Sequence, residues 1–108
     1  MSGGPDTGDR TPAATLEAFR AWQGDTFSTE TADGPVLVRL ERVVAREDLP
    51  PRPDGAVPFV LEFVQCGGPV TLPQATWWLA HPGGARVMVF LVPLGPEDGA
   101  MRYEAVFN

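Results

Sequence analysis

The sequence predicts one mainly β domain, either a small antiparallel barrel or a two-sheet sandwich, with about six or seven short strands and one N-terminal helix. Three observations predict this fold class. The 108 residues include 12 glycines and 12 prolines, which indicates many chain reversals. Apolar side chains repeat with a period of two residues through most of the chain. The turn signals between these segments recur at a short spacing, as is typical of barrels and sandwiches.

The N-terminal part predicts a tail followed by the helix. Residues 1–10 are polar and lack a large apolar side chain, so we expect a disordered tail before a single β-rich domain at residues 11–108. Thr11 and Pro12 suit an N-cap and a first helical turn. A helix over about residues 12–23 places three apolar side chains on one stripe, namely Leu16, Phe19 and Trp22.

Several segments after the helix have strand character. They are residues 26–31, 36–44, 59–65, 70–72, 75–79, 86–92 and 101–107. Residues 86–92 are the most apolar of these, and we predict a central strand that is covered on both faces and ended by Pro93. Arg42 falls on the otherwise apolar face of its strand, which indicates a bulge nearby. Residues 96–99 predict a type I turn before the last strand.

Residues 46–58 are a long stretch without strand character, and they carry four prolines and five charged side chains. Loops of this length are often functional or disordered. Pro50 and Pro53 stand at the PxxP spacing, which can present a polyproline II turn to an aromatic groove. A stiff surface loop is the simpler interpretation, and we favour it.

The charge pattern argues against nucleic acids and membranes as partners. The net charge is −6, and the eight basic residues are scattered arginines, whereas phosphate binding needs a clustered basic face. The first residues lack the apolar region of a signal peptide, and the longest apolar run, Val87 to Val92, is too short to span a bilayer. One cysteine, Cys66, excludes an internal disulfide and suits a reducing compartment, so we expect a cytoplasmic protein.

The residue inventory predicts no enzyme and no cofactor. The chain has no lysine, which excludes Schiff-base chemistry and a Walker-type phosphate loop. With one histidine and one cysteine, a zinc site of the Cys/His type cannot close within one chain. Ser2 and Ser28 lack the motif of a hydrolase nucleophile. A Cys66–His81 pair is possible, but a small cysteine at a strand end explains the same residue more simply.

Glu62 is the acidic residue that needs an explanation, because it lies in the middle of an apolar strand between Leu61 and Phe63. If its face is buried, the carboxylate requires a partner, which Arg39 or Arg102 can supply. We favour such a structural ion pair over a general acid.

The stretch TLPQATWWLAHP at residues 71–82 contains the candidate binding residues. In a strand over residues 75–79, Trp77 faces the core, and Trp78 faces outward among small side chains, as an aromatic anchor would. Gln74 and His81 flank the strand, and His81 lies in a turn. We therefore predict partner or ligand binding at Trp78, Gln74 and His81. The alternative is that the N-terminal helix covers Trp78.

Several segments together resemble a family of small bacterial proteins whose shared domain has no assigned function. They are TFS at 26–28, VLVRLERV at 36–43, FVLEF at 59–63, LPQATWWLAHP at 72–82, VMVFLVPLG at 87–95 and RYEAVFN at 102–108. The resemblance covers residues 19–108, and its LPQ…HP, FLVP and YEAVFN segments are the most specific. It implies a compact β domain, no catalytic residues, and an accessory part in a phage-tail-like or other bacterial assembly.

These observations together predict a non-enzymatic interaction or structural module that binds a protein partner or associates with itself. An exposed aromatic side chain and a sheet edge are the features that would bind. The second hypothesis is a β-barrel that binds a small molecule, with Trp78, Gln74 and His81 near its mouth.

Overall fold

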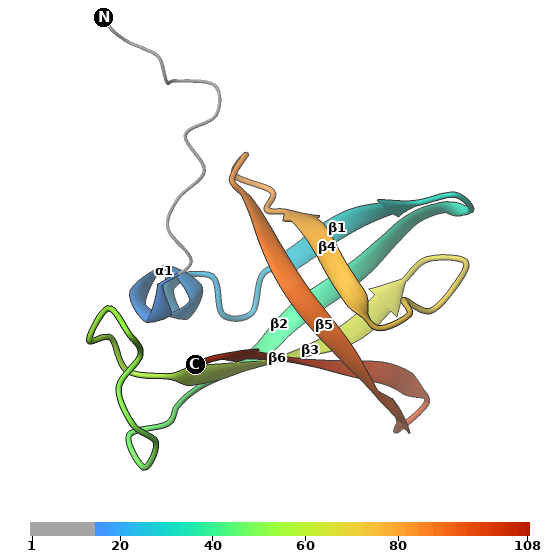
Figure 1. Ribbon diagram of the computed structural model, residues 1–108. Coiled ribbons are helices and arrows are strands. Elements are labelled where there is room, and N and C mark those ends of the chain that lie inside the picture. Colours follow the sequence, from blue (N-terminus) through green and yellow to red (C-terminus); the bar gives the residue numbers. More distant parts are fainter. Residues whose placement is uncertain (1–14) are drawn as a thin grey trace, which may run out of the picture.

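The computed structural model describes residues 15–108, which form a closed six-stranded antiparallel barrel with one short helix (Figure 1). The order of strands around the barrel is β1-β2-β3-β6-β5-β4. The elements are α1 (Leu16–Ala21), β1 (Thr26–Thr31), β2 (Gly34–Ala45), β3 (Phe59–Gly67), β4 (Ala75–Ala80), β5 (Arg86–Glu97) and β6 (Ala100–Phe107). The mainly β fold class with one N-terminal helix is therefore confirmed, and the barrel is the form it takes.

Helix α1 is shorter than the sequence predicts. Thr15 is extended and acts as the N-cap, because its side chain accepts a hydrogen bond of 3.1 Å from the amide of Ala18. The predicted start near residue 12 is therefore wrong, and the predicted cap at Thr11 and the tail at residues 1–10 lie outside the described residues. The predicted apolar stripe of the helix is confirmed, because Phe19 is fully buried and Leu16 and Trp22 pack against the core.

Strands β1 and β2 follow their predicted alternation, whereas on β3 the outward Val60 and Val64 are buried as well as the inner residues. On β2, Val36, Val38 and Leu40 are fully buried, as expected for the inner face. The register between β2 and β3 shifts between Leu40 and Arg42, so the predicted bulge is confirmed. The bulge turns Arg42 to the outside and returns Val43 to the core.

Strand β5 differs from the prediction in three ways. It continues through Pro93 to Glu97, because the register with β6 shifts between Pro93 and Gly95 and accommodates the proline. Its two faces are not both covered: alternate residues are buried and exposed from Arg86 to Leu91. The turn that follows has Asp98 at φ 54° and Gly99 at φ 83°, and two positive φ values fit a type I′ hairpin turn rather than type I.

The chain between β3 and β4 also departs from the prediction. Strand β3 extends to Gly67, which pairs with Leu37, so the predicted break before Cys66 is too early. Residues 70–72 are not a strand. They are held by a side-chain network: the Tyr103 hydroxyl accepts a 2.8 Å hydrogen bond from the amide of Leu72 and donates a 2.7 Å bond to Gln65 Oε1.

The interior of the barrel is filled by side chains from every strand and from α1. The largest fully buried side chains come from α1 and from strands all around the barrel: Phe19, Phe27, Phe59, Phe63, Leu79, Leu91 and Tyr103. Since aromatic rings occupy so much of this space, the barrel is a packed core rather than a pore.

Candidate functional site

Strand β4 separates the two neighbouring tryptophans as the sequence predicts. Trp77 is half-buried and packs against the core, and its indole Nε1 donates a 3.1 Å hydrogen bond to the carbonyl of Pro73. Trp78 points outward with 43% of its surface exposed. Because α1 lies at the end of the barrel beside Phe59 and Phe107, the helix does not cover Trp78.

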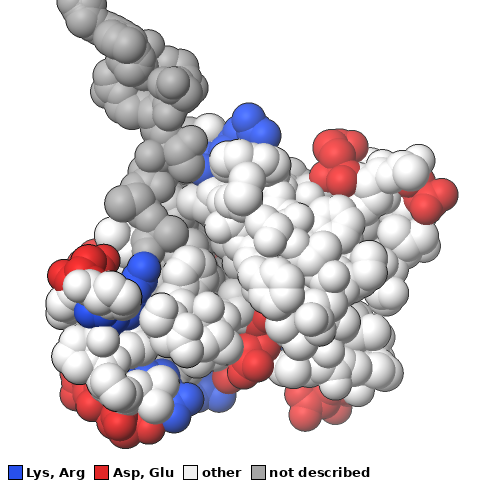
Figure 2. All heavy atoms as spheres, viewed as in Figure 1, with Lys and Arg blue, Asp and Glu red and all other residues white. Residues whose placement is uncertain are grey.

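Trp78 belongs to an exposed apolar surface on the outside of β4 and β5. The register places Trp78 opposite Met88 and Thr76 opposite Phe90, and Leu94 follows on β5. Met88, Phe90 and Leu94 are 49%, 50% and 57% exposed. We call Trp78, Met88, Phe90 and Leu94 the apolar face. Figure 2 shows a broad surface without charged side chains over this part of the barrel. Contiguous exposed apolar surface commonly marks a binding site.

Arg86 provides the charged edge of the apolar face. It pairs with Ala80 at the end of β4, and its guanidinium carbon lies 4.7 Å from the ring centroid of Trp78. A cation at this distance over an indole face is attracted by the ring electrons. The contact favours the ring orientation in which Trp78 faces Arg86.

An open seam lies beside the apolar face, where the barrel closes between β1 and β4. These strands share a single pair, Ser28 with Ala80, whereas every other neighbouring pair of strands shares at least five (Figure 1). The strands diverge beyond that pair and leave a groove of about 420 Å³. Eight residues line the groove: Ser28, Thr29, Glu30, Thr76, Trp77, Trp78, Ala80 and Arg86.

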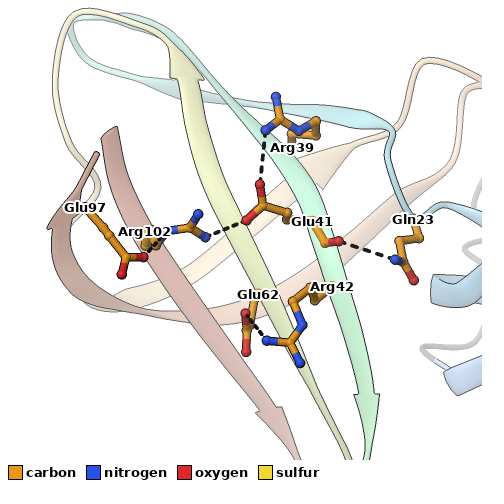
Figure 3. A network of polar contacts seen from close by, with 7 residues as sticks. All are labelled: Gln23, Arg39, Glu41, Arg42, Glu62, Glu97 and Arg102. Atoms are coloured by element: carbon orange, nitrogen blue, oxygen red, sulfur yellow. Dashed lines mark hydrogen bonds and ion pairs between the residues drawn. The ribbon is translucent and has the colours of Figure 1, made fainter. Parts of the chain in front are cut away.

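The outer faces of β2, β3 and β6 carry an ion-pair network (Figure 3) beside two exposed apolar side chains, Leu37 and Val106. Glu41 accepts hydrogen bonds from Arg102 at 2.6 Å and from Arg39 at 3.2 Å. Arg102 also lies 2.6 Å from Glu97. The hydrogen bond from Arg102, followed by that from Arg39, holds the pKa of Glu41 below its usual value against the opposing effect of desolvation. The ion pairs thus concentrate on the side of the barrel formed by β2, β3 and β6.

Glu62 belongs to this network, but its partner differs from the prediction. Arg42 lies 3.5 Å from Glu62, whereas both arginines that the sequence suggested, Arg39 and Arg102, contact Glu41. The bulge explains the difference, because it brings Arg42 opposite Glu62 on the outer surface. Glu62 is an ion-paired surface residue.

We expect Glu41→Gln to reduce the decrease in the free energy of unfolding that occurs as the pH falls into the acidic range. The pKa of Glu41 is lowered in the folded chain, so its ionised form stabilises the fold above the unfolded pKa. This contribution is lost as the pH falls through the folded value. Denaturant midpoints measured from pH 6 to pH 3 should therefore decline less steeply for Glu41→Gln than for the wild type. An equally steep decline in both proteins would contradict the assignment, and Glu47→Gln on the exposed loop is the matched control.

His81 is engaged in structural contacts. Its Nδ1 accepts a 2.9 Å hydrogen bond from the amide of Gly83, so Nε2 carries the proton and donates to Asp25 Oδ2 at 2.7 Å. The ring also packs against Trp22 and Phe27, with centroids 5.2 and 5.3 Å away. These contacts tie the turn after β4 to the start of β1.

The three predicted binding residues do not form one site. Gln74 is exposed just before β4, and His81 follows the other end of the strand, so roughly 20 Å of extended chain separates them. Trp78 lies between them on the outer face. Cys66 is exposed near the β1–β2 hairpin, at the opposite end of the barrel from His81, and the two cannot act as a catalytic pair.

The proline-rich loop at residues 46–58 folds back on itself. Backbone hydrogen bonds join Arg46 to Pro58 and Arg52 to Ala56, and the Arg52 guanidinium lies 5.9 Å from the ring centroid of Phe59. A second hollow of about 460 Å³ separates the loop from α1. Its lining includes the charged side chains of Glu17, Arg52 and Asp54 besides apolar ones, and Phe59 is the aromatic residue among them.

Sequence reasoning missed Met88 and Phe90 as surface residues because an unbroken apolar run is typical of a strand covered on both faces. It also missed Arg86, since its contact with Trp78 depends on the pairing of β4 with β5. Within residues 15–108, no group of three or more histidine, cysteine and acidic side chains is placed to hold a metal ion. The described part of the chain likewise contains no helix of the length and apolar character needed to cross a membrane.

Comparisons with known proteins support the resemblance seen in the sequence. No curated protein and no solved structure matches the chain. Residues 14–107 match the family described as "Domain of unknown function (DUF6916)", which covers almost the whole chain and all seven elements of the fold. The chain therefore belongs to the DUF6916 family.

Proposed function

We propose that this domain is a non-enzymatic module that binds a protein partner through its apolar face. One observation carries the proposal: Trp78, Met88, Phe90 and Leu94 are exposed on β4 and β5. The outer surface of β2, β3 and β6 instead mixes ion pairs with a few exposed apolar side chains such as Leu37 and Val106. Burial of such a surface is favourable in proportion to the apolar area removed from water.

The composition of the apolar face is that of a protein interface. Tryptophan, phenylalanine, methionine and arginine are enriched at the centres of interfaces, and the apolar face with Arg86 contains all four types. Trp78 is the anchor in this proposal, because the contact with Arg86 already favours one ring orientation and so reduces the conformational entropy lost when a partner binds.

The second hypothesis, a barrel that binds a small molecule, has less support. Aromatic side chains fill the barrel interior, so a ligand would have to bind in a surface groove. A role as an accessory part of a phage-tail-like or other bacterial assembly, in the cytoplasm, is the setting we propose for a binding module of this kind.

Site-specific photocrosslinking tests the proposed function. A photoreactive amino acid replaces Phe90 on the apolar face or, as a control, Arg42 on the ion-paired surface, in cells that make the natural protein. We expect a specific cross-linked protein at position 90 and not at position 42. After reconstitution from purified components, Trp78→Ala should weaken that complex at least tenfold, which is about 1.4 kcal/mol.

Two results would contradict the proposed function. One is equal cross-linking at positions 90 and 42. The other is a reconstituted complex whose dissociation constant is unchanged by Trp78→Ala. Circular dichroism of Trp78→Ala should match the wild type, since an exposed side chain contributes little to the fold.

A further inference from the structure

We propose that the seam between β1 and β4 accepts an extended segment of a partner protein, which adds to β4 as a further strand. The inference rests on the proposed function and deepens it, because it names the form and chemistry of the segment that binds. Addition of a strand to an exposed sheet edge is a common mode of peptide recognition.

The ladder pattern shows which backbone groups face the seam. The amide of His81 donates a hydrogen bond to the carbonyl of Ala85 across the β4–β5 turn. Along an antiparallel strand, the backbone amide and carbonyl of successive residues point alternately to one neighbouring strand and to the other. Residues 79, 77 and 75 therefore face β5, whereas Ala80, Trp78 and Thr76 face β1. Only Ala80 has a partner there within residues 15–108. Trp78 and Thr76 have no ladder pair with β1, so their amides and carbonyls are the groups with which an added strand would pair.

Strand β1 contributes the opposite wall of the seam. Ser28 faces β4, because it pairs with Ala80, and so Glu30, two residues further on, faces the same way. Glu30 is exposed and lines the groove together with Thr76 and Trp78. An unpaired edge of this kind tends to bind other strands unless a protein covers it.

The charges along the seam define the chemistry of the segment. Arg86 lies at the closed end beside Ala80, and Glu30 lies toward the open end. Neither has an ion-pair partner within the described residues. A segment that pairs antiparallel with β4 begins at the closed end of the seam and runs toward the open end. Its outward-facing residues should therefore be acidic near Arg86, apolar beside Trp78 and basic near Glu30, in that order along the segment.

A second copy of the chain fits the seam less well than a different protein. Each copy carries a net charge of −6, so two copies repel each other. In addition, a second β4 would have to pass the occupied position at Ala80, where β1 already pairs. We therefore assign the seam to a segment of another protein with the charge order given above.

Binding of a designed peptide to the full chain tests the inference. The probe is N-acetyl-Ser-Glu-Val-Phe-Val-Lys-Ser-amide, and its matched control exchanges the Glu and the Lys. We expect the probe to bind with a dissociation constant below about 1 mM, measured by amide chemical shifts, and the exchanged peptide to bind at least threefold more weakly. No binding of the probe at about 1 mM would overturn the inference.

Two changes test whether backbone pairing carries the binding. Methylation of the probe's Phe amide removes the hydrogen that would face β4, and Thr76→Pro removes the corresponding donor from the protein edge. Thr76→Pro should leave β4–β5 pairing intact, because the amide of residue 76 faces away from β5. Each change should weaken binding at least tenfold, whereas Thr76→Val, which keeps the amide, should bind like the wild type.

The outcomes separate this inference from the proposed function. If Trp78→Ala abolishes binding but Thr76→Pro and the methylated probe bind normally, the apolar face binds partners without strand addition. If Thr76→Pro abolishes binding and Trp78→Ala does not, the seam binds and the apolar face is the wrong site. Should Thr76→Pro fail to fold, the methylated probe on the wild-type protein gives the same decision.

Discussion

Phe19→Ala is expected to lower the free energy of unfolding by about 3–5 kcal/mol, the usual range for truncation of a buried phenylalanine. Phe19 is fully buried, and its ring lies 5.6 Å from Trp22, 5.9 Å from Phe59 and 5.5 Å from Phe107. A helix of six residues is too short to persist without such packing. Loss of the ring therefore opens a cavity and releases α1 from the end of the barrel.

Urea unfolding followed by tryptophan fluorescence measures this effect, because Trp22 lies in the same cluster. Leu94→Ala is the control: Leu94 is 57% exposed, so its truncation should change stability by no more than about 0.5 kcal/mol. If Phe19→Ala lowered the free energy of unfolding as little as Leu94→Ala does, α1 would not pack on the barrel as described.

The alternation of side chains along the strands could be predicted from the sequence, because burial on one face leaves a period of two. Phe59, Leu61 and Phe63 are buried as expected, and the orientations of Trp77 and Trp78 are confirmed. The bulge near Arg42 was also predictable, since a charged residue on an apolar face signals a change of register. The local pattern of residues was therefore sufficient to predict features that do not depend on which strands lie beside each other.

The order of strands and the location of the site depend on contacts between distant residues. Nothing local shows that β5 pairs with β4 along its first half and with β6 along its second. Nor does any local pattern show that Met88 and Phe90, on the outer face of β5, stay exposed in the described part of the chain. The open seam arises for the same reason, because it depends on how far β1 and β4 diverge after their one shared pair. The sequence predicted an anchor at Trp78 but could not predict what surrounds it.

Tyr103→Phe is the second substitution with a large expected effect. Removal of this one hydroxyl oxygen should lower the free energy of unfolding by about 1–3 kcal/mol. Tyr103 is fully buried, and its hydroxyl accepts from the amide of Leu72 and donates to Gln65. Gln65 in turn donates to the carbonyl of Val70. Phenylalanine keeps the ring but leaves the Leu72 amide without a partner, so the segment between β3 and β4 loses its attachment to the core.

The pH dependence of stability distinguishes this network from simple packing. Burial raises the pKa of Tyr103 above its ordinary value of about 10, and the hydrogen bond from Leu72 opposes this only partly. Between the unfolded and the folded pKa, the unfolded chain has lost a proton that the folded chain retains. Stability must therefore fall as the pH rises above about 10. Denaturant midpoints from pH 8 to pH 11 should decline in the wild type more steeply than in Tyr103→Phe. Parallel curves would mean that the hydroxyl is not confined in the core, since the chain has no other tyrosine or lysine to titrate in this range.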